Sequence, residues 1–202
     1  MNLNADFTQR IVLHGAQMPW ADSPMPGVQR RMLDRIGDEV ARATSIVRYA
    51  PGSAFTPHTH GGGEEFIVLN GVFSDEHGDY PAGSYIRNPP TTSHSPRSVP
   101  GCIIFVKLWQ FDPADRTEVV VDMNRLARTK DPLRPGIEVA RLFEDVRETV
   151  ELQIWQPGSR LDENLPGGAE LLVLQGSLTE LGDELTSMSW LRLPCGATLR
   201  AQ

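Results

Sequence analysis

Short apolar runs, broken by glycine and proline, alternate along most of this chain. Runs rich in β-branched and aromatic residues occupy residues 45–50, 65–69, 84–88 and 102–111. Pro-Gly, Asn-Gly, His-Gly and Pro-Pro steps separate them, and such steps mark turns. Many short strands at this spacing, with few segments of helical period, predict an all-β sandwich or barrel.

The second half of the chain repeats features of the first half at a nearly constant offset. Residues 51–53 recur as 157–159, 68–71 as 173–176, 84–89 as 189–194, and Gly27-Val28 resembles Gly136-Ile137. A duplicated β unit explains this pattern, with its join within the charged, proline-containing residues 112–135. We therefore predict a first domain of residues 1–118 and a second domain of residues 119–202.

Composition narrows the class of protein. The chain has 202 residues, of which 40% are hydrophobic and 22% charged, and these values are ordinary for a soluble globular protein. A formal net charge of −7, with no basic run longer than Arg30-Arg31, argues against a general nucleic-acid binder. No apolar run approaches the roughly 20 residues that cross a bilayer, and the first ten residues lack a secretory pattern. We expect no membrane partner and a cytoplasmic location.

The strongest candidate for chemistry is a group of donors in the first half. His58 and His60 stand two residues apart, so on a strand both side chains point to the same side. The glycines 61–63 let the chain turn, so that Glu64 can return to the same point, and His94 follows on the next predicted strands. Nitrogen and oxygen donors that converge in this way suit a divalent transition metal.

Neighbouring residues have alternative interpretations. Phe66 and Val68 share the predicted strand face of Glu64 and would form the wall of a metal cavity, although simple barrel core explains them equally well. Glu65 should point the other way, to the surface or behind the ligands. His77 lies in a predicted hairpin turn, where we expect it to be exposed, and it is the substitute ligand should His94 not bind.

The second half lacks the donors. Residues 119–202 contain no histidine. In the internal alignment, Asn164, Pro166 and Ala169 stand where His58, His60 and Glu64 stand in the first half, and Leu199 lies near the position of His94. We expect one metal site, in the first half.

The spacing Gly52-x5-His58-x-His60-x3-Glu64-x6-Gly71 resembles the first motif of the cupin superfamily. The wider block, residues 75–90 with His94 and residues 105–113, is similar to the cupin domain of ChrR-type anti-sigma factors. This resemblance covers most of residues 20–120. It implies a double-stranded β-helix of jelly-roll type, which the internal repeat extends to a bicupin with a degenerate second cupin. It also implies a metal ion held by His58, His60, Glu64 and His94.

Two departures limit what the resemblance implies. His94 comes later after Gly83 than in the general second cupin motif. ChrR-type proteins bind their sigma factor through a separate zinc domain with a His-x3-Cys-x2-Cys signature, and this sequence contains none. A sigma factor or other regulator is therefore a partner by family analogy only. A homodimer is expected on the same ground.

The predicted site suits one divalent ion, Zn, Fe or Mn. Four protein ligands on an ion that accepts up to six leave room for a small molecule. With Fe or Mn, the site would suit a dioxygenase-type enzyme acting on a chelating substrate such as a β-dicarbonyl or catechol-like compound, as the resemblance to cupin dioxygenases implies. The alternatives are a non-catalytic regulatory or sensor cupin of an oxidative-stress response, and a structural zinc site. The sequence identifies no catalytic residue.

Overall fold

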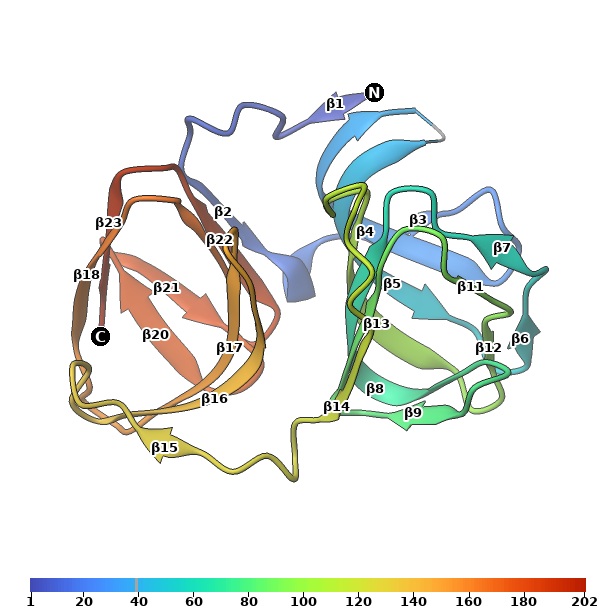
Figure 1. Cartoon of the computed structure of the whole chain (residues 1–202). Coiled ribbons are helices and arrows are strands. Elements are labelled where there is room, and N and C mark those ends of the chain that lie inside the picture. Colours follow the sequence, from blue (N-terminus) through green and yellow to red (C-terminus); the bar gives the residue numbers. More distant parts are fainter. Residues whose placement is uncertain (39) are drawn as a thin grey trace. The chain divides into compact units, whose positions relative to one another are not determined.

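The computed structural model describes residues 1–38 and 40–202, and it is built of short strands with one three-residue 3-10 helix, Gly15–Gln17 (Figure 1). The chain forms two compact units. Unit 1 comprises Met1–Ala5 and Pro19–Arg125, and unit 2 comprises Asp6–Met18 and Leu126–Gln202. In the described ranges, no helix has the length and apolar character needed to span a membrane. The assignment of functions to domains 1–118 and 119–202 stays a prediction.

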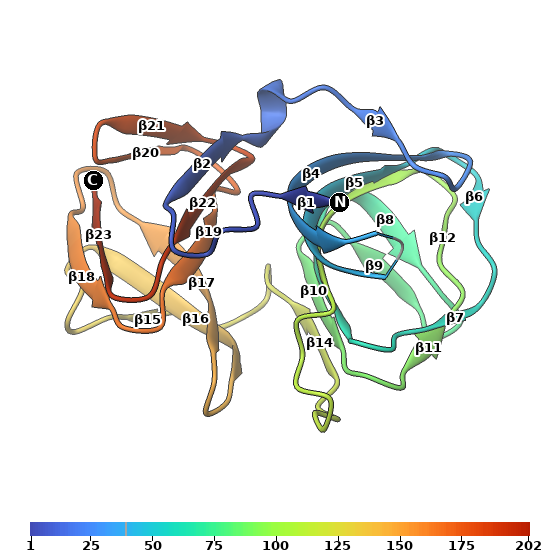
Figure 2. The same cartoon turned by 90° about the horizontal axis from the view of Figure 1, so that it is seen from above.

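Unit 1 is organised around one antiparallel sheet with the order β1-β4-β5-β13-β8-β10-β14 (Figures 1 and 2). Its strands are β1 (Asn2–Leu3), β4 (Val28–Gly37), β5 (Ala41–Tyr49), β8 (Glu64–Ser74), β10 (Ser84–Asn88), β13 (Cys102–Leu108) and β14 (Val119–Asp122). Short strands flank it: β3 (Ala21–Asp22), β6 (Ser53–Ala54), β7 (His58–Thr59), β9 (Asp79–Pro81), β11 (Ser93–His94) and β12 (Arg97–Ser98). Among the described residues, β7 and β11 form a separate two-stranded sheet.

Alternating residues of these strands build the core of unit 1. Phe66 and Val68, two residues apart on β8, are both 1% exposed and pack in one cluster with Phe73 and Ile104. The Phe66 and Phe73 ring centroids are 4.7 Å apart. Burial of this cluster stabilises the unit, because apolar area removed from water contributes about 25 cal/mol per Å². Phe66 and Val68 are thus core residues, and their role as a cavity wall stays a prediction.

Unit 2 contains three smaller antiparallel sheets, with the orders β15-β16-β17, β18-β23-β20-β21 and β19-β22-β2. Their strands are β2 (Ile11–His14), β15 (Thr129–Lys130), β16 (Ile137–Glu144), β17 (Thr149–Trp155), β18 (Leu161–Leu165), β19 (Ala169–Leu172), β20 (Ser177–Glu180), β21 (Asp183–Thr186), β22 (Ser189–Leu193) and β23 (Ala197–Ala201). The core includes Ile137, Leu185 and Leu191.

Corresponding residues of the internal sequence repeat have the same turn geometry in the two units. Gly27 and Gly136 both have a positive φ, +78° and +81°, which favours glycine. The Ala50 amide donates to the Gly27 carbonyl at 2.8 Å, and the Gln156 amide donates to the Gly136 carbonyl at 2.9 Å. Corresponding residues of the two halves therefore make the same contact in their own unit.

Residues 6–18 join unit 2 although they precede most of unit 1 in the sequence. Strand β2 pairs with β22, and Val12 lies opposite Leu191. Arg10 binds the buried Glu180 carboxylate at 2.5 Å and Asp183 at 2.7 Å. No local sequence pattern had indicated this association.

Candidate metal centre

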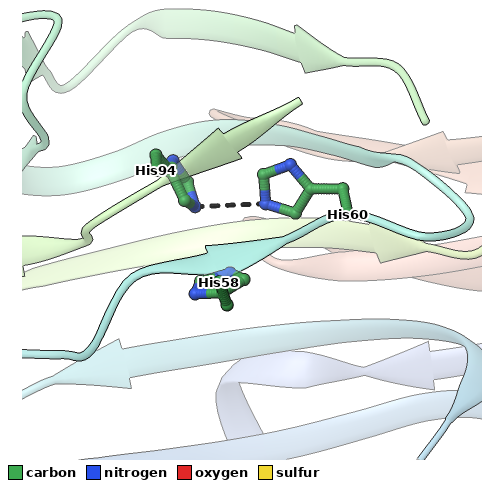
Figure 3. Close-up of side chains that lie close together, drawn as sticks. All are labelled: His58, His60 and His94. Carbon is green, nitrogen blue, oxygen red and sulfur yellow. Dashed lines mark hydrogen bonds between the residues drawn. The ribbon is translucent and has the colours of Figure 1, made fainter. Parts of the chain in front are cut away.

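Three histidines of unit 1 come together at one point (Figure 3). His58 on β7 lies directly opposite His94 on β11 in the antiparallel pair, and His60 follows β7. One ring nitrogen from each histidine lies within 4.8 Å of the others. Among the residues that the structure describes, this is the one such group of three or more histidine, cysteine or acidic side chains.

The backbone holds these rings in place. The His60 amide donates to the Thr92 carbonyl and the Thr91 amide donates to the His60 carbonyl, each at 2.9 Å, so the β7–β11 pairing continues past the strand ends. The ring centroids lie 4.6 to 5.1 Å apart with interplanar angles of 76° to 84°. His60 and His94 are buried and His58 is exposed, so the group is open to solvent on the His58 side.

Glu64, at the start of β8, adds a carboxylate to the group. Its Oε2 atom lies 3.4 Å from His60 Nε2 and 3.5 Å from His94 Nε2. Asn88 Nδ2 donates to the same oxygen at 3.4 Å. Burial raises the pKa of Glu64 to about 7, although the Asn88 hydrogen bond favours the charged form. A cation beside this carboxylate would stabilise its ionised form.

Hydrogen bonds at the far side of two rings fix which nitrogen faces the group. His60 Nδ1 lies 2.9 Å from Thr92 Oγ1, and that hydroxyl donates to the Pro89 carbonyl at 2.7 Å, so it accepts from the ring. His94 Nδ1 lies 3.3 Å from Asp75 Oδ2, which can only accept when ionised. Both rings therefore carry hydrogen on Nδ1, and their Nε2 lone pairs face inward. Metal-binding histidines typically have such an acceptor on the second nitrogen.

The inward-facing atoms are arranged as donors to a cation. His60 Nε2 and His94 Nε2 lie 3.2 Å apart, the contact drawn as a dashed line in Figure 3. A proton shared between them is disfavoured, because burial lowers the pKa of His60 to about 3 and also lowers the pKa of His94. Two imidazole nitrogens and a carboxylate oxygen fit a divalent transition metal better than they fit a proton.

The three glycines before Glu64 have a second role besides the predicted turn. Gly63 has φ +79°, which a turn residue needs, but Gly61 and Gly62 do not have positive φ. A Cβ atom on Gly62 would lie 2.3 Å from Cδ2 of Trp109, and a Cβ atom on Gly63 would lie 2.3 Å from Phe111. The glycines therefore let the segment between His60 and Glu64 pack directly on two aromatic rings.

Replacing Gly62 by alanine is expected to weaken metal binding by about tenfold or more, because the His60–Glu64 segment or the Trp109 ring must move, and misplaced ligands lose affinity. Titration with Ni(II) or Zn(II) would measure the change. Gly167→Ala is the matched control, since a Cβ atom there meets nothing within 4 Å. Equal affinities for both variants would show that the aromatic contact does not position the ligands.

Asp75 provides a test of the ring orientation. Its Oδ1 accepts from the His77 and Gly78 amides, at 2.8 and 3.1 Å, and its Oδ2 faces His94. In Asp75→Asn, the side-chain oxygen can keep the two backbone hydrogen bonds while the amide nitrogen faces His94 Nδ1, which places the ring hydrogen on Nε2. We expect metal affinity to fall about 10- to 100-fold with little loss of stability. Asp79→Asn, an exposed change nearby, should leave affinity unchanged, and a wild-type affinity in Asp75→Asn would contradict the assigned orientation.

Other predicted residues lie outside the group. His77 is exposed and is not part of the three-histidine group. Glu65 is buried and accepts a hydrogen bond from the Tyr85 hydroxyl, so of its two predicted positions, at the surface or behind the ligands, the surface position is wrong. The tyrosine that covers it is distant in sequence. The sequence did not indicate Thr92 or Asn88, because a hydrogen-bond partner of a ligand has no fixed sequence spacing.

The corresponding position in unit 2 is filled by a neutral polar pair. Asn164, aligned with His58, lies opposite Thr198 in the β18–β23 pair, as His58 lies opposite His94. The Thr198 hydroxyl donates to Asn164 Oδ1 at 3.0 Å. This pair offers a hydroxyl and an amide where the first unit offers two imidazoles.

The family model described as the ChrR Cupin-like domain matches residues 8–112, more than half of the chain. The chain belongs to the ChrR cupin-like family. The match includes all three histidines of the group and Glu64. No curated protein sequence matches the chain.

Solved structures support the same fold over the whole chain. The "putative dioxygenase" of Nostoc punctiforme PCC 73102 has a TM-score of 0.78 at 16% identity, covering 96% of this chain and 78% of that one. The Cupin 2 conserved barrel domain protein of Leptotrichia buccalis has a TM-score of 0.61 at 13% identity, with 95% and 88% covered. An Escherichia coli pirin in complex with nickel(II) has a TM-score of 0.56 at 11% identity, with 96% and 93% covered. The predicted all-β jelly-roll cupin fold is confirmed.

Proposed function

We propose that this ChrR-like cupin binds one divalent transition metal through His58, His60, Glu64 and His94, and that the metal binds a small chelating molecule. The observation that carries this proposal is the approach of His60 Nε2 and His94 Nε2 to 3.2 Å while each Nδ1 is held by an acceptor. Glu64 adds a negative charge at 3.4 to 3.5 Å from both. Such a set of nitrogen and oxygen donors suits a divalent transition metal ion.

The side chains around the site suit a bound small molecule. A bound Fe(II) or Mn(II) ion would supply dioxygen activation, whereas Zn(II) would supply Lewis acidity or structural support. The exposed His58 lies on the side where a ligand can enter. The buried Phe73 ring packs beside His94, with its centroid 5.7 Å from that of the imidazole, and adds an apolar neighbour to the site. An enzyme of dioxygenase type acting on a β-dicarbonyl or catechol-like compound is the activity we propose.

Two measurements test this function. Protein purified without added metal should contain close to one transition-metal ion per chain by elemental analysis. The Fe(II)-loaded protein should then consume oxygen with at least one member of a panel of diketones and phenols. Metal uptake without oxygen consumption would reject the enzyme and keep the metal site. Failure to bind any metal after incubation with excess metal would reject both.

The second candidate is a non-catalytic regulatory cupin, which is favoured by membership of the ChrR cupin-like family. Its partner would be a sigma factor or another regulator of an oxidative-stress response. A stoichiometric regulator recovered with the tagged protein from its source cell would support it. Recovery of no regulator, together with turnover of a panel substrate, would reject it.

A further inference from the structure

Arg30 lies on the inner face of unit 1. In the β4–β5 pair it stands directly opposite Val47, a core residue, and directly opposed residues of a sheet point to the same face. Its neighbour Arg31 points the other way, with the guanidinium 4.0 Å from the Trp20 ring centroid. Arg48, the neighbour of Val47, stacks on the same ring at 4.4 Å. Because side chains alternate between the two faces of a strand, Arg31 and Arg48 contact Trp20 on one face of the sheet, and Arg30 points to the opposite, inner face.

This inner face is the one that carries Glu64. Arg35 lies directly opposite Ala43 of β5, Ala43 opposite Leu108 of β13, and Leu108 opposite Glu64 of β8. Opposed residues point to the same face of a sheet. Arg30 and Arg35 therefore share the inner face of β4 with the acidic ligand of the histidine group. Figures 1 and 2 both draw β4 and β5 on one side of unit 1 and β7 with β11 on the other.

Arg30 also lacks a counter-charge. It is partly buried, and within the described ranges its guanidinium has no hydrogen-bond or ion-pair partner. Burial lowers the pKa of Arg30, and the neighbouring Arg35 charge lowers it further. A partly buried guanidinium beside a second cation costs stability unless an anion offsets it. The Arg35 guanidinium donates to the Asp38 carbonyl, so Arg30 is the one of these two arginines that has no partner within the described ranges.

We propose that Arg30 binds a carboxylate of the small molecule that chelates the metal, so that the ligand class is an anionic chelator, such as a β-dicarbonyl or catechol-like compound bearing a carboxylate. This inference rests on the proposed function. The guanidinium presents paired N–H donors that match the two oxygens of a carboxylate. The metal would bind the chelating oxygens, and Arg30 would orient the other end of the molecule.

The test compares 2,4-dioxopentanoate with 2,4-pentanedione, two diketones that differ by a carboxylate, on the Ni(II)-loaded full chain by calorimetric titration. Affinities are divided by those of the same ligands for free Ni(II), and metal content is measured after each titration. Wild type should favour the carboxylate-bearing ligand by about tenfold, the usual value of a charged hydrogen bond. Arg30→Gln should abolish that preference without changing pentanedione affinity, and Arg30→Lys should keep part of it.

Arg97→Gln, an exposed change on β12, is the matched control and should keep the full preference. A preference that persists in Arg30→Gln, or an absence of preference in wild type, would overturn the role of Arg30 and leave the metal site standing. Failure of the wild type to retain Ni(II) would overturn the proposed function, and with it this inference. Melting curves of each variant distinguish lost binding from lost folding.

Discussion

His60→Ala is expected to lower metal affinity by at least about 100-fold, more than the loss typical of a residue that only supports a ligand. The ring is buried, and its Nε2 lies within 3.5 Å of both His94 and Glu64. Removing the ring takes away one donor nitrogen. His94 and Glu64 then lose the neighbour with which they would surround the metal ion. Inductively coupled plasma analysis of the purified variant, with competition titration against a chelator, would measure the loss.

The internal duplication supplies the control for this experiment. Asn164→Ala changes the position of unit 2 that aligns with His58, the first histidine of the group, and there a hydrogen bond to Thr198 takes the place of the His58–His94 pair. Its metal content should equal that of the wild type. A comparable loss from both variants would mean that the site is not restricted to the first half, and unchanged affinity in His60→Ala would reject His60 as a ligand.

Arg10→Ala is expected to destabilise the protein by about 3–5 kcal/mol, because it removes the principal partner of a buried carboxylate. Glu180 is 0% exposed, and its Oε2 accepts from Arg10 Nε at 2.9 Å and from Nη2 at 2.5 Å. The lost pair also ties residues 6–18 to unit 2. Urea unfolding followed by circular dichroism would report the change as a lower midpoint of the affected transition.

Arg160→Ala serves as the comparison, since Arg160 is exposed and belongs to the same unit. Its stability should stay within about 0.5 kcal/mol of the wild type, as for most surface changes. A loss below about 1 kcal/mol in Arg10→Ala would argue that Glu180 is solvated or paired otherwise, against the packing of residues 6–18 described above.

The sequence alone predicted the features that depend on short spacings. The two-residue period of a strand predicted that His58 and His60 point to the same side of the chain. The glycines 61–63 predicted a turn that brings Glu64 close to them. The resemblance to cupins added His94 and the jelly-roll fold. The structure places these four side chains close together, because strand alternation and turn chemistry act over a few residues; their role as metal ligands stays a prediction.

Only the tertiary structure decided what surrounds those side chains. Thr92 and Asp75 set the ring nitrogens, and Trp109 explains why glycines precede Glu64. Arg10 reaches Glu180 across 170 positions of sequence, and the register of four strands puts Arg30 on the inner face with Glu64. Such contacts join residues that no periodicity relates, because packing and strand register, rather than local spacing, fix which distant groups meet.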